Sequence, residues 1–187
     1  AVGRPLTVTD PAGVTTTYTW SQRGLKLSEQ IEGQGTALYT YDLADNLVAV
    51  TDPLGATTSY AYDSRGRRIS RTDDDGNVET WTYYDDGQVA SYTDPLVLVG
   101  QDPRTTTYTY DAAGRLATVV DPTLRTTMFS YDPSGLVTQR LYEMPGPGGV
   151  LSETHTFTYD PVTGRRTSMT DPSGTSTFSY NAAGDLL

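Results

Sequence analysis

The chain has 187 residues, of which only 36% are apolar and 19% are charged, and it contains 18 glycines and 11 prolines. Cysteine is absent, which excludes disulfides, thiol catalysis and cysteine-based zinc sites. No run of 18 apolar residues is present, so we expect no membrane insertion by a helix. The formal net charge of −10 makes nucleic acid and anionic membrane surfaces poor partners, because their phosphate groups would be repelled.

Aromatic residues recur at a nearly constant spacing along the whole chain. We define the anchor as the aromatic residue that opens each Tyr-Asp-like element. The anchors are Trp20, Tyr41, Tyr62, Tyr83, Tyr110, Tyr131, Tyr159 and Tyr180, at intervals of 21, 21, 21, 27, 21, 28 and 21 residues. Two residues before each anchor lies a second aromatic: Tyr18, Tyr39, Tyr60, Trp81, Tyr108, Phe129, Phe157 and Phe178. The two ladders hold 16 of the 19 aromatic residues, which predicts about eight repeats.

Each repeat combines two strand patterns with two turn patterns. In residues 17–20 aromatic residues alternate with threonine, and this period of two places both rings on one face of a strand. An Asp-x-x-Gly turn follows, as in Asp111 to Gly114, and its glycine should take a positive φ. Residues 115–120 read as a second strand, and Asp121-Pro122 opens the second kind of turn.

The pattern predicts an all-β fold: a meander of about 16 short antiparallel strands that forms a twisted, curling single-layer sheet with essentially no helix. We expect residues 1–187 to be a single array of about eight repeats. Both ends fall within a repeat and neither carries a polar cap. Since repeat arrays need caps for solubility, we expect the array to be part of a larger protein.

Departures from the regular spacing, in chain order, mark candidate contact surfaces. In the repeat that begins at Trp20, residues 31–35 replace the Asp-Pro turn. Six extra residues follow Asp94-Pro95 and include the apolar run Leu96, Val97, Leu98 and Val99. Seven extra residues lie around Met144, Pro145 and Pro147. Both insertions replace the same kind of turn, so we expect two partner-contact loops on one edge of the sheet. The apolar run should pack either against a neighbouring module or cargo, or against the chain's own aromatic face.

No residue pattern points to catalysis, to a cofactor or to a metal. The aspartates fall in the predicted turns, where an Asx-type turn explains them better than a catalytic carboxylate pair. His155 is the only histidine and stands where other repeats carry threonine, which indicates a structural role. Residues 73–77 are acidic but lack the ligand spacing of an EF-hand. We therefore expect a non-enzymatic protein with no cofactor.

The repeat unit resembles the YD repeat of the Rhs (rearrangement hotspot) family. Its clearest units are Tyr108-Thr-Tyr110-Asp111-Ala-Ala-Gly114-Arg115-Leu116 and Tyr60-Ala-Tyr62-Asp63-Ser-Arg-Gly66-Arg67, and the resemblance covers the whole chain. The family includes Rhs toxins, the shells of insecticidal toxin complexes, bacterial wall-associated proteins and teneurins. The resemblance implies a segment of a spiral β-shell in an exported toxin or cell-surface protein. Its implied partners are the remaining repeats and domains of the parent protein and an enclosed toxin polypeptide. Residues of the family's self-cleaving core have no counterpart in this sequence.

Two other readings stay open from the residues themselves. Choline- or glucan-binding repeats are also about 20 residues long and rich in tyrosine and glycine, so a module that binds carbohydrate, a surface glycan or the cell wall is the alternative function. A β-propeller with two units in each blade is a third reading. It ranks last, because alternate repeats do not differ systematically.

Overall fold

The computed structural model describes residues 3–95, 104–146 and 148–187, and these residues form strands and turns without any helix. The strands are β1 (Thr7–Thr9), β2 (Thr15–Trp20), β3 (Lys26–Ile31), β4 (Gly35–Tyr41), β5 (Leu47–Thr51), β6 (Thr57–Tyr62), β7 (Arg68–Thr72), β8 (Val78–Tyr83), β9 (Val89–Asp94), β10 (Arg104–Tyr110), β11 (Leu116–Val120), β12 (Thr126–Tyr131), β13 (Val137–Gly146), β14 (Gly149–Tyr159), β15 (Arg166–Asp171) and β16 (Gly174–Thr177). They form one 16-stranded open sheet in chain order, which confirms the predicted antiparallel meander.

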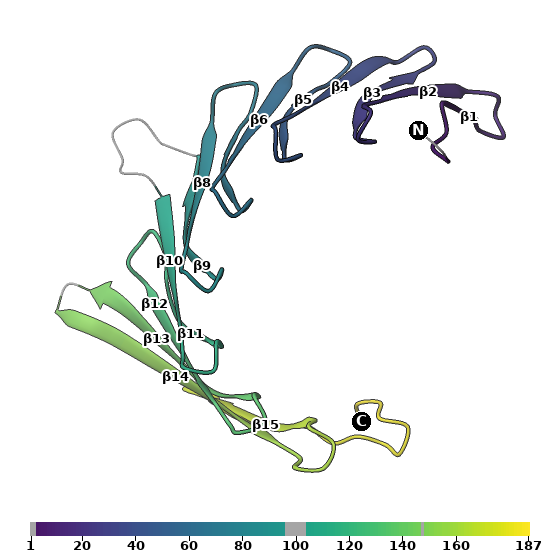
Figure 1. The fold of residues 1–187 in the computed structure, drawn as a ribbon. Helices are drawn as coiled ribbons and strands as arrows, with labels where there is room; N and C mark the ends of the chain where they lie inside the picture. The colour runs from purple at the N-terminus through teal and green to yellow at the C-terminus, as the bar shows by residue number, and fades with distance from the viewer. Residues whose placement is uncertain (1–2, 96–103, 147) are drawn as a thin grey trace. The chain divides into compact units, whose positions relative to one another are not determined.

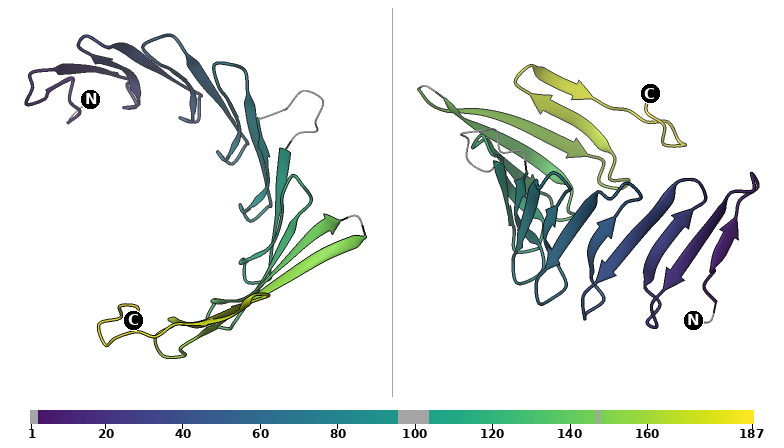
Figure 2. Two further views of the ribbon diagram at one scale, coloured as in Figure 1. Left: turned by 180° about the vertical axis from the view of Figure 1, so that it is seen from behind. Right: turned by 90° about the horizontal axis from the view of Figure 1, so that it is seen from above.

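The chain divides into two compact units, residues 1–82 with 93–99 and residues 83–92 with 100–187. In the first unit β1 to β7 follow one another side by side, and tight turns join them at alternating edges (Figures 1 and 2). In the second unit β10 to β16 repeat the same arrangement. A propeller would need separate sheets as blades, so the propeller reading is wrong. The described residues include no helix long and apolar enough to cross a bilayer.

An aspartate closes each Tyr-Asp turn by accepting backbone hydrogen bonds. Asp111 Oδ1 accepts the N–H groups of Ala113 and Arg115, both at 2.9 Å. The backbone of Asp111 donates to the Arg115 carbonyl at 2.8 Å and accepts from the Gly114 N–H at 2.9 Å. Gly114 takes a φ of +77°, and the register shifts within the hairpin beside the turn. This is a type I turn followed by a bulge with a left-handed residue, and it confirms the predicted role of the glycine.

The Asp-Pro turns use the same hydrogen bonds. Asp52 Oδ1 accepts the N–H groups of Leu54 and Ala56 at 2.8 and 3.0 Å, and Gly55 takes a φ of +96°. Two turns place another residue at the left-handed position, namely Asp45 at +69° and Leu124 at +64°. Aspartate tolerates this region, whereas leucine is strained there. The geometry is therefore fixed by the repeat even where glycine is missing.

The two faces of the sheet carry different side chains. On one face threonine hydroxyls pair across the Asp-Pro turns, as between Thr51 and Thr57 at 2.9 Å. On the other face lie the aromatic ladders, whose rings are half-buried, while the residues between them are exposed. Only Phe157, at 5% exposure, is a buried apolar residue among those described. The sheet therefore has no second layer and no conventional core.

The insertion around Met144 lengthens a hairpin instead of forming a loop, which corrects the expectation. Met144 and Pro145 lie in β13, and β13 pairs with β14 over eight positions, up to Gly146 opposite Gly149. On one side, β12 pairs with β13 only as far as Glu143. On the other side, β15 pairs with β14 only as far as Thr156. The tip of the hairpin thus extends beyond both neighbouring strands (Figure 1). The physical reason is that residues 137–159 continue the strand pattern through the insertion. Pro147 and the other insertion, Leu96 to Val99, lie outside the described residues.

The turn geometry predicts that Gly114→Val destabilises the chain more than Ala113→Val, by at least about 1 kcal/mol. A Cβ at Gly114 would lie 3.7 Å from Gln88 Nε2, an ordinary contact, so the cost is that of forcing a β-branched residue to positive φ. Ala113 is exposed in the same turn and has no such constraint. Thermal or denaturant unfolding measures the difference, and equal stabilities for the two variants would contradict the turn assignment.

Candidate functional site

Strands of neighbouring repeats diverge at the edge that carries the Tyr-Asp turns. Pairing between β4 and β5 extends to Leu47 beside the turn, whereas pairing between β5 and β6 stops at Ala49. The Asn46 carbonyl accepts the Asp42 N–H at 3.0 Å. Because successive carbonyls of a strand point in opposite directions, the Leu47 carbonyl faces β6, where no backbone partner reaches it.

The anchor ring of the next repeat fills this gap and satisfies the free carbonyl. Tyr62 Oη donates to the Leu47 carbonyl at 2.9 Å. The same bond recurs as Trp20 Nε1 to Pro5 O at 3.0 Å, Tyr110 Oη to Val89 O at 3.1 Å, Tyr131 Oη to Leu116 O at 2.7 Å, Tyr159 Oη to Val137 O at 2.8 Å and Tyr180 Oη to Arg166 O at 2.9 Å. Burial raises the pKa of Tyr110, so its hydroxyl stays a donor. Each of these six anchors thus ties one repeat to the preceding one.

In three repeats the arginine that follows the turn glycine lies against the next repeat. The Arg115 guanidinium stacks on the Tyr131 ring at 4.6 Å and donates to the Asp132 carbonyl at 3.0 Å. Arg4 and Arg165 stack in the same way on Trp20 and Tyr180, both at 5.5 Å. Arg4, Arg115 and Arg165 thus each lie over a ring of the next repeat, and each contact contributes about 0.5–2 kcal/mol.

Turn glycines also make room for these arginines. A Cβ on Gly24 would lie 1.3 Å from Arg4 Nη1, and one on Gly184 would lie 1.9 Å from Arg165 Nη2. The positive φ requires glycine at both positions, and a Cβ there would also force the flexible guanidinium end of the arginine to move.

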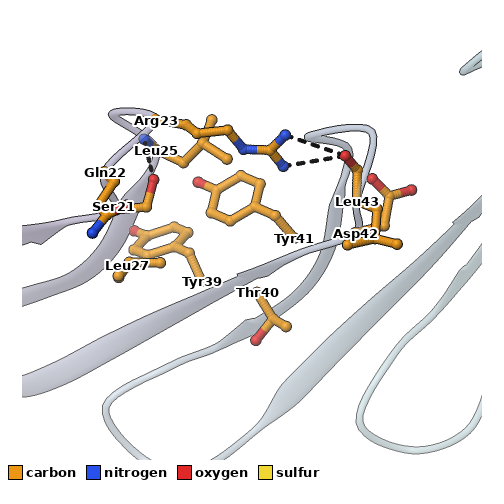
Figure 3. Close-up of a pocket in the computed structure, with 10 residues that line it drawn as sticks. All are labelled: Ser21, Gln22, Arg23, Leu25, Leu27, Tyr39, Thr40, Tyr41, Asp42 and Leu43. Atoms are coloured by element: carbon orange, nitrogen blue, oxygen red, sulfur yellow. Dashed lines mark hydrogen bonds between the residues drawn. The ribbon is translucent and has the colours of Figure 1, made fainter.

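Shallow grooves open between consecutive Tyr-Asp turns, where the strands diverge. One lies between residues 21–27 and 39–43, with Tyr39 and Tyr41 along its floor (Figure 3). Arg23 crosses it and donates to the Leu43 carbonyl at 3.2 and 3.3 Å. Similar grooves lie beside Tyr110 and beside Tyr159. They are the recurring concave features of the described surface, and they are built from turn backbone, tyrosine and aspartate.

The aspartates of these grooves are already engaged by their own turns. Backbone N–H groups, that of Arg67 foremost, hold the pKa of Asp63 below its usual value. Arg67 Nε adds an ion pair at 2.7 Å, and Arg115 Nε pairs with Asp111 at the same distance. The pKa of Asp111 is lowered by the same kind of contacts. Carboxylates held in this way are ionised hydrogen-bond acceptors that close their own turns.

His155 and the acidic run at residues 73–77 show no catalytic or metal geometry. His155 Nε2 lies 2.5 Å from Glu153 Oε1, and the imidazole packs edge-on against Tyr142 at 5.1 Å. The Asp73 carboxylate accepts hydrogen bonds from the backbone and side chain of Asn77 at 2.8–3.1 Å. Across the three described ranges, no three histidine or acidic side chains gather as metal ligands would.

Cations also lie over the second aromatic ladder, which the sequence analysis did not predict. Lys26 stacks on Tyr39 at 4.3 Å and Arg68 on Trp81 at 4.4 Å. Arg140 lies 5.8 Å from Phe129. These cations stand in the second strand of a repeat, across from the aromatic strand. The sequence signal is a basic residue six or nine positions after an anchor.

The RHS repeat model matches residues 41–78, 98–126 and 159–187, which together make up just over half of the chain. Two of the three matched segments begin at an anchor, Tyr41 or Tyr159. The chain belongs to the RHS repeat family. No curated protein matches it in sequence.

The fold of this RHS repeat array is also that of a part of much longer solved structures. A chain of the Tc holotoxin pore of Photorhabdus luminescens aligns with a TM-score of 0.59 and 20% identity, over 98% of this chain and 12% of that chain. The crystal structure of TcdB2-TccC3 without its hypervariable C-terminal region aligns with a TM-score of 0.43 and 15% identity, over 97% of this chain and 14% of that one. The array therefore spans about an eighth of the length of these chains.

Removal of one anchor hydroxyl tests the contact between repeats. Tyr131→Phe leaves the Leu116 carbonyl without a donor, so we expect a loss of about 1–2 kcal/mol of unfolding free energy. The matched control is Tyr108→Phe: its hydroxyl makes no hydrogen bond to the described residues, and it should change stability by less than about 0.5 kcal/mol. Chemical denaturation measures both, and equal effects would exclude the anchor bond as a stabilising contact.

The turn carboxylates predict that the array loses stability in acid. The pKa values of Asp42, Asp63, Asp111 and Asp160 are lowered, chiefly by hydrogen bonds from their own turns. A carboxylate whose pKa is lowered in the folded state stabilises the fold fully at a pH above its unfolded-state pKa of about 4. This contribution is lost as the pH falls through the folded-state pKa. We expect a constant melting temperature from pH 7 to about 5 and a steep fall below about pH 4.

Asp111→Asn tests whether protonation of the turn carboxylates causes the loss of stability in acid, because asparagine keeps the Asx-turn acceptor but cannot titrate. The melting temperature of this variant should fall less between about pH 5 and 2 than that of the unaltered chain. Asp75→Asn is the charge-matched control, since the Asp75 carboxylate accepts no hydrogen bond from the described residues. An identical acid profile for all three proteins would contradict the turn origin.

Proposed function

We propose that this chain is a non-catalytic wall segment of the β-shell of an exported toxin complex, and that the shell encloses a polypeptide cargo. One observation carries the proposal: consecutive repeats join edge to edge through the same anchor bond, without a second layer on either face. Such a sheet extends by adding repeats and offers no enclosed pocket, as a wall requires. Membership in the RHS repeat family and the fold shared with a Tc holotoxin chain support this reading.

The proposed wall is one part of a longer array that belongs to a secreted or cell-surface protein. The short share of the Tc holotoxin chain that it spans supports this view. The engaged state of turn aspartates such as Asp63 and Asp111 supports a non-enzymatic role, because N–H groups of their own turns already occupy these carboxylates. Binding of glycans by the aromatic ladders is less favourable, since most anchor hydroxyls are already bound to backbone carbonyls and several rings carry a stacked guanidinium.

The tip of the β13–β14 hairpin is the proposed contact of this wall with the rest of the parent protein or with its cargo. Val150 and Leu151 are 66% and 62% exposed there, and Pro145 is also exposed. Val150 lies opposite Pro145 and Leu151 lies opposite Met144 in the hairpin. The tip therefore presents a small apolar surface beyond the neighbouring strands. The same role is proposed for residues 96–99, which lie outside the described part of the chain.

Protease protection in the full-length protein that contains this segment tests the proposal. The enclosed polypeptide should resist proteinase K in the unaltered protein and become accessible when Tyr131→Ala and Tyr159→Ala remove two neighbouring anchors. Leu43→Ala, at a side chain that is 95% exposed, is the control and should preserve protection. Deletion of residues 144–151 should preserve the sheet and weaken retention of the partner or cargo.

Three outcomes would overturn parts of the proposal. Cargo that is equally accessible in the unaltered protein would exclude encapsulation. Retention unchanged by the hairpin deletion would exclude the tip as a contact. Hydrolytic turnover that copurifies with the chain and disappears on replacement of one aspartate would exclude the non-catalytic role.

A further inference from the structure

Two guanidinium groups surround the most buried ring of the described chain. The Cζ atoms of Arg140 and Arg166 lie 5.4 and 4.8 Å from the centroid of Phe157, which is only 5% exposed. Arg140 comes from β13 and Arg166 from the start of β15, on the two sides of β14. Since both lie within 5.4 Å of one ring, the two charges are no more than twice that distance apart.

Neither guanidinium has a carboxylate partner among the described residues. The Nε atoms of Arg140 and Arg166 are buried without a hydrogen bond. Two other stacked cations are neutralised locally: Lys26 pairs with Glu29 at 2.6 Å and Arg115 with Asp111 at 2.7 Å. Arg4 and Arg165 also stack without an ion pair among the described residues, but each lies over a ring of its own. Arg140 and Arg166 differ in that two guanidinium groups without an ion pair share one ring, in a chain of net charge −10.

Neighbouring acidic groups are engaged elsewhere. Asp132 and Asp160 line the groove beside Phe157, and their carboxylates accept backbone N–H groups of their own turns. Glu153 Oε1 contacts His155 Nε2 at 2.5 Å. The Asp171 carboxylate accepts the Ser173 hydroxyl and N–H at 2.5 and 2.8 Å. His155 stands across from Arg140 in the register of β13 and β14, so it can only add positive charge when protonated. The surface around Phe157 is therefore a local basic site on an aromatic face.

We propose that Arg140 and Arg166 bind a carboxylate-bearing polypeptide segment at this surface. Guanidinium groups held by stacking lose little freedom on binding, and their planar donors match both oxygens of a carboxylate. The site lies on an open sheet face beside Phe129 and Met169. Acidic residues interspersed with apolar ones therefore fit it best. The inference does not depend on the proposed shell.

Fluorescence anisotropy with a labelled (Glu-Phe-Gly)3 peptide at low salt is the test, with (Gln-Phe-Gly)3 as the neutral probe. The overall charge of the chain repels the acidic peptide, so preferential binding reports a local basic site. We expect the acidic peptide to bind at least tenfold more tightly than the neutral one. Arg140→Met and Arg166→Met keep an apolar stem over Phe157 and should each weaken binding at least fivefold.

Arg125→Gln is the charge-matched control in the same unit, because Arg125 is exposed in a turn. It should change affinity less than twofold. The Nε–H signals of Arg140 and Arg166 in a nitrogen-proton correlation spectrum give a second readout, and both should shift on addition of the acidic peptide. Arg140→Lys keeps the charge without the planar donors and should also weaken binding.

Equal affinity for the two peptides would overturn the proposal, as would an equal loss in Arg125→Gln. Displacement of the peptide by inorganic phosphate at low millimolar concentration would also overturn it, since the site would then be one for small oxyanions. If the methionine variants unfold, the Nε–H shifts in the unaltered chain decide: unshifted signals reject the site.

Discussion

A sheet of one layer cannot bury either face against a second layer, and the rest of this structure follows from that constraint. Apart from Phe157, no apolar side chain of the described residues is buried, so stability must come from contacts along the sheet. The aromatic rings supply this stability because they lie over the neighbouring repeat. Tyr131, for example, covers the gap beside β11, and the Arg115 guanidinium stacks on its ring. Each repeat thus serves as the packing surface of the next, as in other quasi-one-dimensional proteins.

The geometry of the turn determines which carbonyl the anchor side chain must bind. Because Asp111 closes a turn with a left-handed glycine, the register shifts by one residue beside it. The Arg115 carbonyl then returns to the Asp111 N–H, and the Leu116 carbonyl points to the next repeat. That carbonyl needs a donor at the end of a long, rigid side chain, which tyrosine provides. Tyrosine is therefore favoured at the anchor for its hydroxyl, and tryptophan replaces it at Trp20 by offering an indole N–H.

Local features of the fold could be predicted from the sequence, whereas contacts between repeats could not. The strands, the two turns and the positive φ of Gly66 and Gly114 follow from alternation and turn chemistry, which act over a few residues. The bond from Tyr62 to Leu47 spans 15 residues and depends on which carbonyl the bulge leaves free. The lengthened hairpin was missed because glycine and proline near Pro145 resemble a loop, although the residues around them continue to pair.

Charge is segregated in this array, and the segregation shows where a partner can act. Carboxylates concentrate in the turns at the edges of the sheet, where backbone N–H groups hold them ionised. Several cations instead lie over rings on the aromatic face, where their stems replace the missing second layer. Where a turn or neighbouring carboxylate reaches such a cation, as for Lys26, the charge is satisfied within the chain. Around Phe157 no carboxylate of the described residues pairs with Arg140 or Arg166. The cations that cover the rings stabilise a single-layer sheet, and around Phe157 they also leave a basic surface. An acidic segment from outside the described chain can neutralise the charge of this surface.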